Sequence, residues 1–161
     1  SFDNIEFKIK ANYMNRIKIF FTVALAVLMT SCTDKTVETV EYLDVNANNL
    51  SGKWELVEWN GSPLASGTYV YLDIVRNNRT YTMYQNLDSF TNVPHKVTGS
   101  YYIDYDPELG AILRGNYDHD SGDWAHRYIV KDLTATEMYW IAKDDRTFIQ
   151  KYVRVDSIPV E

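Results

Sequence analysis

The chain has 161 residues, a formal net charge of −6 and one cysteine, Cys32. One cysteine excludes a disulfide within the chain and a cluster of thiolate metal ligands. The first 31 residues carry four basic and two acidic side chains, which leaves 12 basic and 20 acidic side chains in the rest. This acidic balance disfavours nucleic acid as a partner, because Lys and Arg that neutralise phosphates dominate such affinity.

The N-terminal segment has the pattern of a secretory signal. Residues 1–13 precede a short basic run, Met14 to Lys18, and we expect them to be an upstream extension. Eleven residues follow, Ile19 to Met29, and all but Thr22 are apolar. They are too few to cross a hydrocarbon core of about 30 Å as a helix. A basic stretch, an apolar stretch and small residues in this order predict a signal peptide over residues 14–31.

The end of this segment resembles the lipobox of bacterial lipoproteins. Thr30 and Ser31 are the small residues before Cys32, and Met29 stands where that family usually has leucine. The resemblance implies that the sulfur of Cys32 carries a diacylglycerol, with acyl chains such as palmitate. It also implies a lipid anchor in a membrane of the cell envelope, and we expect the outer membrane. The alternative is a buried cysteine at the end of an ordinary amphipathic helix.

A polar segment separates this cysteine from the remaining sequence. Residues 32–49 are rich in Thr, Asp, Glu and Asn, and such a segment cannot bury enough apolar surface to offset the entropy of ordering it. We expect a flexible tether here, followed by one domain over residues 50–161. Asn46 to Leu50 is compatible with one helical turn across the base of that domain.

Eight strand candidates follow Gly52, each bounded by turn residues. They are residues 53–59, 68–76, 79–85, 95–104, 111–114, 123–130, 137–142 and 147–155. No helical pattern longer than ten residues interrupts them, which disfavours parallel β/α architectures. The predicted fold is therefore all-β, an eight-stranded antiparallel up-and-down barrel.

The loop lengths distinguish the two ends of this barrel. The loops after the first, third and fifth strands are long, covering residues 60–67, 86–94 and 115–122. Alternate loops of an up-and-down meander lie at the same end, because consecutive strands run in opposite directions. We therefore expect one end with elaborate loops, forming a mouth, and a trimmed end that forms the base.

Residues at the two ends of the domain resemble a known family. Gly52-Lys53-Trp54 resembles the lipocalin Gly-x-Trp motif, and Arg154 stands where the lipocalins have a basic residue that covers this tryptophan. The whole resembles the small lipocalin-like lipoproteins of Bacteroidetes-type bacteria over roughly residues 50 to 155. The middle lipocalin motif and the C-terminal helix are missing, so a lipocalin-like barrel is better supported than a true lipocalin.

Strand parity places a mostly aromatic set of side chains inside the barrel if Trp54 and Arg154 point inward. As candidate ligand-binding residues we take Tyr81, Met83, Tyr101, His126, Tyr128, Trp140, Phe148 and Gln150. A closed eight-stranded barrel holds one small ligand or is filled by side chains. Both interpretations stay open from the sequence.

The sequence contains only weak indications of metal binding or catalysis. The loop from Asn116 to Asp123 alternates oxygen ligands, but Ser121 replaces the glycine of a calcium loop and Arg127 replaces its bidentate glutamate. His95, His119 and His126 form no spaced pair for zinc. No nucleophile elbow, phosphate loop or zincin motif is present. We therefore expect no metal, no cofactor and no catalytic residue.

The leading hypothesis is a lipid-anchored envelope protein whose lipocalin-like barrel binds or carries a small apolar or amphipathic molecule. The alternative is a module with a filled barrel whose mouth loops recognise a protein or a glycan. A third class, an enzyme with an unrecognised site, is disfavoured by the missing motifs. Cavity volume separates the first two hypotheses.

Overall fold

The computed structural model describes residues 39–87, 94–119 and 122–159. The expected signal peptide and Cys32 lie outside these residues. The chain divides into two units, residues 1–39 and 40–161, and the fold described below is that of the second. Within the described ranges, no helix is both long enough and apolar enough to cross a membrane.

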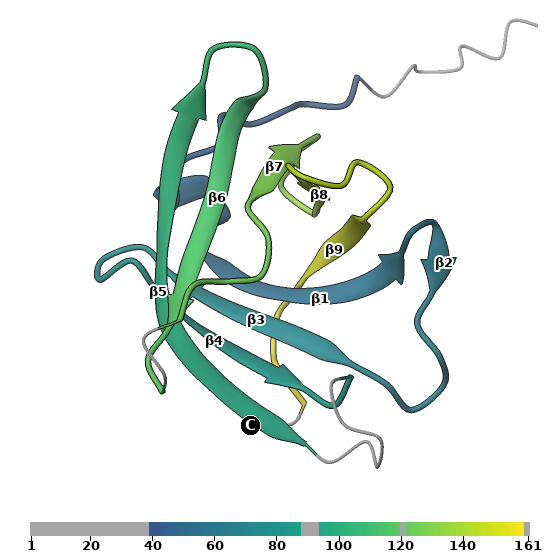
Figure 1. Ribbon diagram of the computed structural model, residues 1–161. Helices are drawn as coiled ribbons and strands as arrows, with labels where there is room; N and C mark the ends of the chain where they lie inside the picture. Colours follow the sequence, from purple (N-terminus) through teal and green to yellow (C-terminus); the bar gives the residue numbers. More distant parts are fainter. Residues whose placement is uncertain (1–38, 88–93, 120–121, 160–161) are drawn as a thin grey trace, which may run out of the picture. The chain divides into compact units, whose positions relative to one another are not determined.

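The second unit is a closed antiparallel barrel (Figure 1). Its described elements are α2 (Ala47–Leu50), β1 (Gly52–Trp59), β2 (Ser62–Pro63), β3 (Val70–Val75), β4 (Thr80–Gln85), β5 (His95–Asp106), β6 (Gly110–Tyr117), β7 (Tyr128–Lys131), β8 (Glu137–Ala142) and β9 (Ile149–Val155). The two-residue strand β2 pairs with the end of β1. From β3 to β9 each strand pairs with the next, while β1 pairs with both β3 and β9 and so closes the cylinder.

The predicted eight-stranded antiparallel barrel is confirmed, with three differences at its strands. The strand β2 lies in a stretch expected to be only a turn. The strand β6 continues to Tyr117 instead of ending at Arg114. The strand β7 begins at Tyr128 instead of Asp123, because residues 125–127 leave the sheet.

Long connections gather at one end of the barrel, as predicted. They follow β1, β4, β6 and β8, and their described parts are residues 60–69, 86–87, 94, 118–119, 122–127 and 143–148. We name this end the mouth. The connections at the other end, the base, are residues 76–79, 107–109 and 132–136. The antiparallel order of the strands fixes this separation.

The short helix α2 covers the base. Its N-cap Asn46 accepts hydrogen bonds from the backbone N–H groups of Asn48 and Asn49, at 2.9 and 3.0 Å, which satisfies donors at the helix start. The side chain of Leu50 at its end is fully buried. The indole Nε1 of Trp54 donates to the carbonyl of Leu50 at 2.9 Å. The predicted helical turn at the base is thus present and is tied to the first strand.

The residues of the barrel-base motif meet at this end. Trp54 and Arg154 are direct partners in the β1–β9 ladder, and the Arg154 guanidinium lies over the Trp54 ring. Gly52 has a φ of 127°, and a Cβ there would collide with the guanidinium of Arg154. Glycine is therefore required at this position both by backbone conformation and by close approach.

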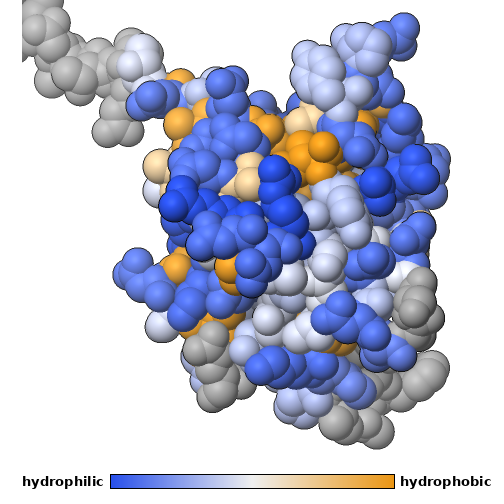
Figure 2. Space-filling view, turned by 90° about the vertical axis from the view of Figure 1, so that its left-hand side faces the viewer, coloured by the Kyte–Doolittle hydropathy of each residue, from blue (hydrophilic) through white to orange (hydrophobic). Residues whose placement is uncertain are grey.

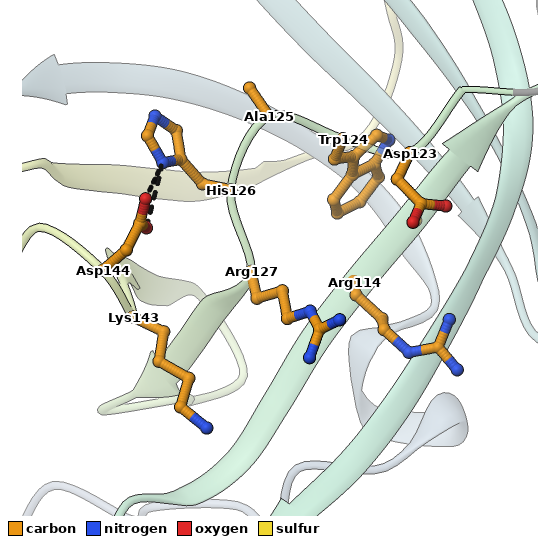
Figure 3. Close-up of a pocket in the computed structure, with 9 residues that line it drawn as sticks. Arg114, Asp123, Trp124, Ala125, His126, Arg127, Lys143 and Asp144 are labelled. Atoms are coloured by element: carbon orange, nitrogen blue, oxygen red, sulfur yellow. Dashed lines mark hydrogen bonds and ion pairs between the residues drawn. The ribbon is translucent and has the colours of Figure 1, made fainter.

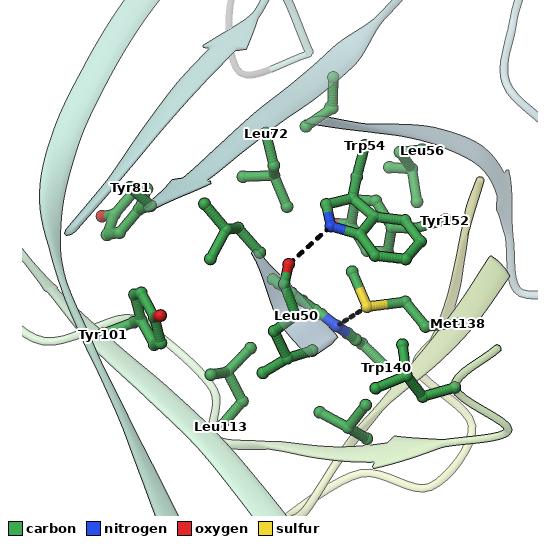
Figure 4. Packing of buried hydrophobic residues seen from close by; sticks show 14 residues of the cluster. Leu50, Trp54, Leu56, Leu72, Tyr81, Tyr101, Leu113, Met138, Trp140 and Tyr152 are labelled. Carbon is green, nitrogen blue, oxygen red and sulfur yellow. Dashed lines mark hydrogen bonds between the residues drawn. The ribbon is translucent and has the colours of Figure 1, made fainter. Parts of the chain in front are cut away.

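Buried side chains fill the barrel from the base upward (Figure 4). Strands alternate inward and outward residues, as in the buried Val70, Leu72 and Ile74 of β3. Leu43 and Val45, in the segment expected to be a tether, pack against this core, and the N–H of Leu43 donates to the carbonyl of Leu133 at 2.7 Å. On the outside, hydrophilic residues cover most of the face in Figure 2, while apolar residues gather in a recess near its top.

Candidate ligand-binding site

The mouth half of the barrel contains an open pocket of about 470 Å³, here named the mouth pocket. Small-molecule sites commonly have volumes of about 300 to 1,000 Å³. The aromatic part of its lining is Trp59, Trp124, Tyr128, Trp140, Phe148 and Tyr152. Val70, Met83, Leu87 and Ala125 add apolar surface, and Gln85, Tyr117, His126 and Gln150 add polar atoms. The barrel is thus filled at its base and hollow at its mouth.

The aromatic rings of the pocket support one another. Trp140 stacks on Trp124 with ring centroids 5.7 Å apart and lies 4.7 Å from the ring of Tyr152. Phe148 meets Trp59 edge to face at 4.8 Å. Such pairs stabilise by about 0.5 to 1.5 kcal/mol beyond the burial of their surface. The walls are therefore held in place by ring contacts.

Trp59 reaches the pocket through a β-bulge. In the β1–β9 ladder Leu56 pairs with Tyr152 and Glu58 pairs with Lys151, so Val57 is the extra residue. Simple alternation from Trp54 would turn Glu58 inward and Trp59 outward. The extra residue reverses this parity, and the apolar ring faces the pocket in place of a carboxylate.

Two asparagines fix the rim. Asn86 is buried; it accepts from the N–H of Tyr69 and donates to the carbonyl of Gly67, both at 2.8 Å. Asn60 exchanges two bonds with Ile149: its side chain accepts from the Ile149 N–H at 2.8 Å and its N–H donates to the Ile149 carbonyl at 2.7 Å. These bonds anchor the loop after β1 on both sides.

Gln150 is the buried polar group of the pocket. Its residue is 6 % exposed, and its Oε1 accepts from the Tyr152 hydroxyl at 3.2 Å. Within the described part of the chain, its amide nitrogen has no hydrogen-bond partner. This nitrogen is not among the buried polar atoms that lack a partner in the described part of the chain, so it faces the open space of the pocket. It is therefore a ready donor for an acceptor atom of a ligand.

His126 stands at the rim with Asp144. Its Nδ1 lies 3.0 and 3.1 Å from the two carboxylate oxygens of Asp144. This hydrogen bond is the main cause that lowers the pKa of Asp144 from its ordinary value. The His126 ring also packs on Phe148, with centroids 4.8 Å apart. The pair holds the imidazole against the aromatic wall, and Nε2 has no hydrogen-bond partner among the residues that the structure describes.

Two tyrosines of the pocket stay protonated far above neutral pH. Burial raises the pKa of Tyr128 to about 12. Burial also raises the pKa of Tyr152 well above its ordinary value. Both hydroxyls therefore act as neutral hydrogen-bonding groups.

Six of the eight candidate residues meet in this pocket: Met83, His126, Tyr128, Trp140, Phe148 and Gln150. The other two point into the barrel below it. Tyr81 accepts from the indole Nε1 of Trp124 at 2.8 Å and donates to the carbonyl of Asn116 at 3.1 Å. The buried hydroxyl of Tyr101 has no partner within the described ranges. Both belong to the packed core and do not line the mouth pocket.

Eight further residues line the pocket. Strand parity directs Val70, Trp124 and Tyr152 inward, and sequence reasoning missed the other five: Trp59, Gln85, Leu87, Tyr117 and Ala125. The inward position of Trp59 was predictable: the adjacent apolar residues Leu56 and Val57 break the alternation of the strand, which indicates a bulge. Gln85 lies two residues after Met83 on β4 and therefore faces inward with it. Tyr117 faces inward because β6 extends further than predicted. Leu87 and Ala125 lie in loops, where alternation predicts nothing.

The three histidines do not come together as a metal site. His95 and His119 line another hollow, next to Tyr117, whereas His126 lies at the mouth pocket. Within the residues that the structure describes, no group of three or more His, Cys, Asp or Glu side chains could hold a metal ion. Asp120 and Ser121 of the calcium-like loop lie outside the described residues.

A second hollow, of about 510 Å³, opens on the barrel wall between β6 and the segment before β7 (Figure 3). We name it the lateral cleft. It is lined by Arg114, Gly115, residues 123–127, Lys143 and Asp144. The indole of Trp124 packs on Gly115 so closely that a Cβ there would collide with it.

The lateral cleft arises because the wall is locally unpaired. Leu113 pairs with Tyr128, and the Trp124 N–H donates to the Gly115 carbonyl at 2.8 Å. Between these two links β6 has one residue, while the opposite segment has three, 125–127. The longer segment bows away from β6, and the Lys143 N–H binds the carbonyl of Arg127 at 2.7 Å.

Comparison with known proteins gives no match: no family model, no curated protein and no solved structure is significantly similar to the chain.

Proposed function

We propose that this chain is a lipid-anchored, lipocalin-like barrel of the bacterial cell envelope that binds or carries a small apolar or amphipathic molecule in the mouth pocket. The observation that carries the binding proposal is the open aromatic pocket with the amide nitrogen of Gln150 at its wall, which has no hydrogen-bond partner among the described residues. Aromatic walls bury an apolar body, while a few polar groups orient a head group. The anchor rests on the basic, apolar and small residues before Cys32.

We propose that the protein acts as a carrier and not as an enzyme. His126 and Asp144 form a histidine–carboxylate pair at the rim, but the sequence shows no catalytic motif around them. We therefore assign the imidazole a role in holding the rim and contacting a polar head group. The competing hypothesis, recognition of a protein or glycan by the mouth loops, requires a filled barrel, and the mouth half is open.

A neutral fluorescent probe tests the proposal. N-phenyl-1-naphthylamine should bind saturably at one site and quench tryptophan emission, because four tryptophan and tyrosine rings that contact one another line the pocket. Met83→Trp should abolish binding, since Met83 lines the pocket and a larger ring would fill it.

Tyr84→Trp is the matched control. Tyr84 neighbours Met83 on β4, but its ring lies under the Lys96 ammonium at 5.3 Å and does not line the pocket. This variant should bind the probe like the wild type. Absence of saturable binding to the wild type, with Met83→Trp destabilised by about 1 to 3 kcal/mol through overpacking, would favour the loop-mediated alternative.

A further inference from the structure

We infer that the bound molecule is an amphipathic anion, whose anionic group binds Arg127 in the lateral cleft while its apolar part occupies the mouth pocket. This inference rests on the proposed function. It concerns a carboxylate, sulfonate or phosphate group, which the planar guanidinium binds with two parallel hydrogen bonds.

The two hollows share a thin wall. Trp124, Ala125 and His126 line both of them. Trp124 and His126 have ring side chains, whereas Ala125 has only a methyl group. The side-chain barrier between the two hollows is therefore smallest at Ala125. Arg127 follows two residues later on the cleft side (Figure 3). A short arm that passes Ala125 would bring a head group from the mouth pocket to this guanidinium.

Most charges around the cleft already have partners. The Arg114 Nε binds Asp104 at 2.8 Å, and the Lys143 Nζ binds Asp106 at 3.2 Å. The third carboxylate, Asp144, is bonded to His126. The charges of Arg114, Lys143 and Asp144 are therefore largely neutralised by their partners.

Arg127 is different. Among the described residues its guanidinium has no hydrogen bond and no ion pair. Arg114 and Lys143 lie on either side of it (Figure 3), and Arg114 keeps two terminal NH₂ groups that its Nε bond does not use. Asp123 lies at the Trp124 end of the cleft, away from Lys143. Among the described residues, Arg127 is therefore the cation of the cleft lining whose charged group has no partner, in a chain whose net charge is −6.

Two probes with one ring skeleton test this inference. 8-Anilinonaphthalene-1-sulfonate is N-phenyl-1-naphthylamine with an added sulfonate. Wild-type protein should bind the sulfonate probe about fivefold more tightly, the effect of a partly exposed ion pair. This preference should fall as salt is added, whereas binding of the neutral probe should not change.

The variants assign the preference to one residue. Arg127→Gln should remove the preference and leave the affinity for the neutral probe unchanged, while Arg127→Lys should keep part of it. Arg76→Gln is the charge-matched control. Arg76 lies at the base, where it binds the Asn48 side chain, and it lines neither hollow. It should bind both probes like the wild type.

The outcomes separate the two proposals. If the neutral probe binds but the sulfonate brings no gain, or if Arg127→Gln keeps the gain, the anion site is wrong and the mouth pocket stands. Equal weakening of both probes by Arg127→Gln would mean a structural role and also overturn the anion site. If neither probe binds the wild type, both proposals fall.

Discussion

The guanidinium carbon of Arg154 lies 4.1 Å from the ring centroid of Trp54, the cation–π contact at the base of the barrel. The same guanidinium donates to the carbonyls of Ser51, Asn49 and Ala135 at 2.7, 2.9 and 2.8 Å. Burial lowers the pKa of Arg154 from its ordinary value, yet arginine stays charged at neutral pH. One side chain thus joins the start of β1, the end of α2 with the residue that follows it, and the turn before β8.

Truncating the ring of this pair should strongly destabilise the fold. Trp54 is fully buried, and Trp54→Ala should lower the free energy of unfolding by about 3 to 5 kcal/mol, as large core truncations do. Urea denaturation measures the loss. Tyr105→Ala, whose ring is 81 % exposed, should change stability by less than about 0.5 kcal/mol. A loss below about 1 kcal/mol for Trp54→Ala would contradict its role at the base.

Replacing the Arg154 guanidinium by an ammonium tests whether its planar set of N–H donors is needed to bind the three carbonyls. Arg154→Lys keeps the charge, but a single ammonium cannot reach three carbonyls on two separate segments. We expect a loss of about 1.5 to 3 kcal/mol, the range of a hydrogen bond to a charged group. Arg146→Lys, in the exposed turn between β8 and β9, is the matched control. Equal stability of the two variants would show that charge alone acts at the base.

Stability should fall at alkaline pH. The pKa of Tyr128 is about 12 in the fold against 10.0 ordinarily, so between these values the folded chain keeps a proton that the unfolded chain has lost. The contribution, about 3 kcal/mol, is complete below pH 10 and is lost as pH rises through 12. Tyr152 adds to it with the same sign.

Urea denaturation of the wild type and of Tyr128→Phe between pH 9 and 12 measures this slope. The variant should lose less stability over that range, because one of the two buried hydroxyls is gone. Tyr105→Phe controls for the removal of an exposed hydroxyl. Identical slopes for the wild type and Tyr128→Phe would show that the hydroxyl is not shielded from water.

Much of this fold is predictable from the sequence, because most strands alternate apolar and polar residues and end at turn residues. Alternation correctly directs Met83, Trp140 and Gln150 inward. It fails at Trp59, where one extra residue reverses the parity. This failure has a physical origin: a bulge changes the facing of every later residue in its strand, and its position depends on the partner strand.

Processing at Cys32 is tested by fractionation. Two or more acyl chains give a stable anchor and one gives only marginal binding, since each buried CH₂ contributes about 0.8 kcal/mol. Cys32→Ala in the full chain, expressed in a lipoprotein-forming bacterium, should move the protein from the membrane pellet to the soluble fraction. An unchanged urea midpoint would show that the barrel is intact. Retention in the pellet after a high-salt wash would contradict the anchor.

The bow of residues 125–127 also makes the β6–β7 boundary the weakest seam of the cylinder. The ladder between β6 and β7 has only the pairs Ile112 with Ile129 and Leu113 with Tyr128, and beyond the bow a single bridge joins Asn116 to Asp123. By contrast, β5 and β6 are paired from Gly99 to Asp106. Amide hydrogens along this seam should exchange with solvent faster than those of β5, because fewer backbone bonds must break to expose them. Trp124, His126 and Tyr128 line the mouth pocket beside this seam, so we expect local opening of the seam to change the shape of the pocket.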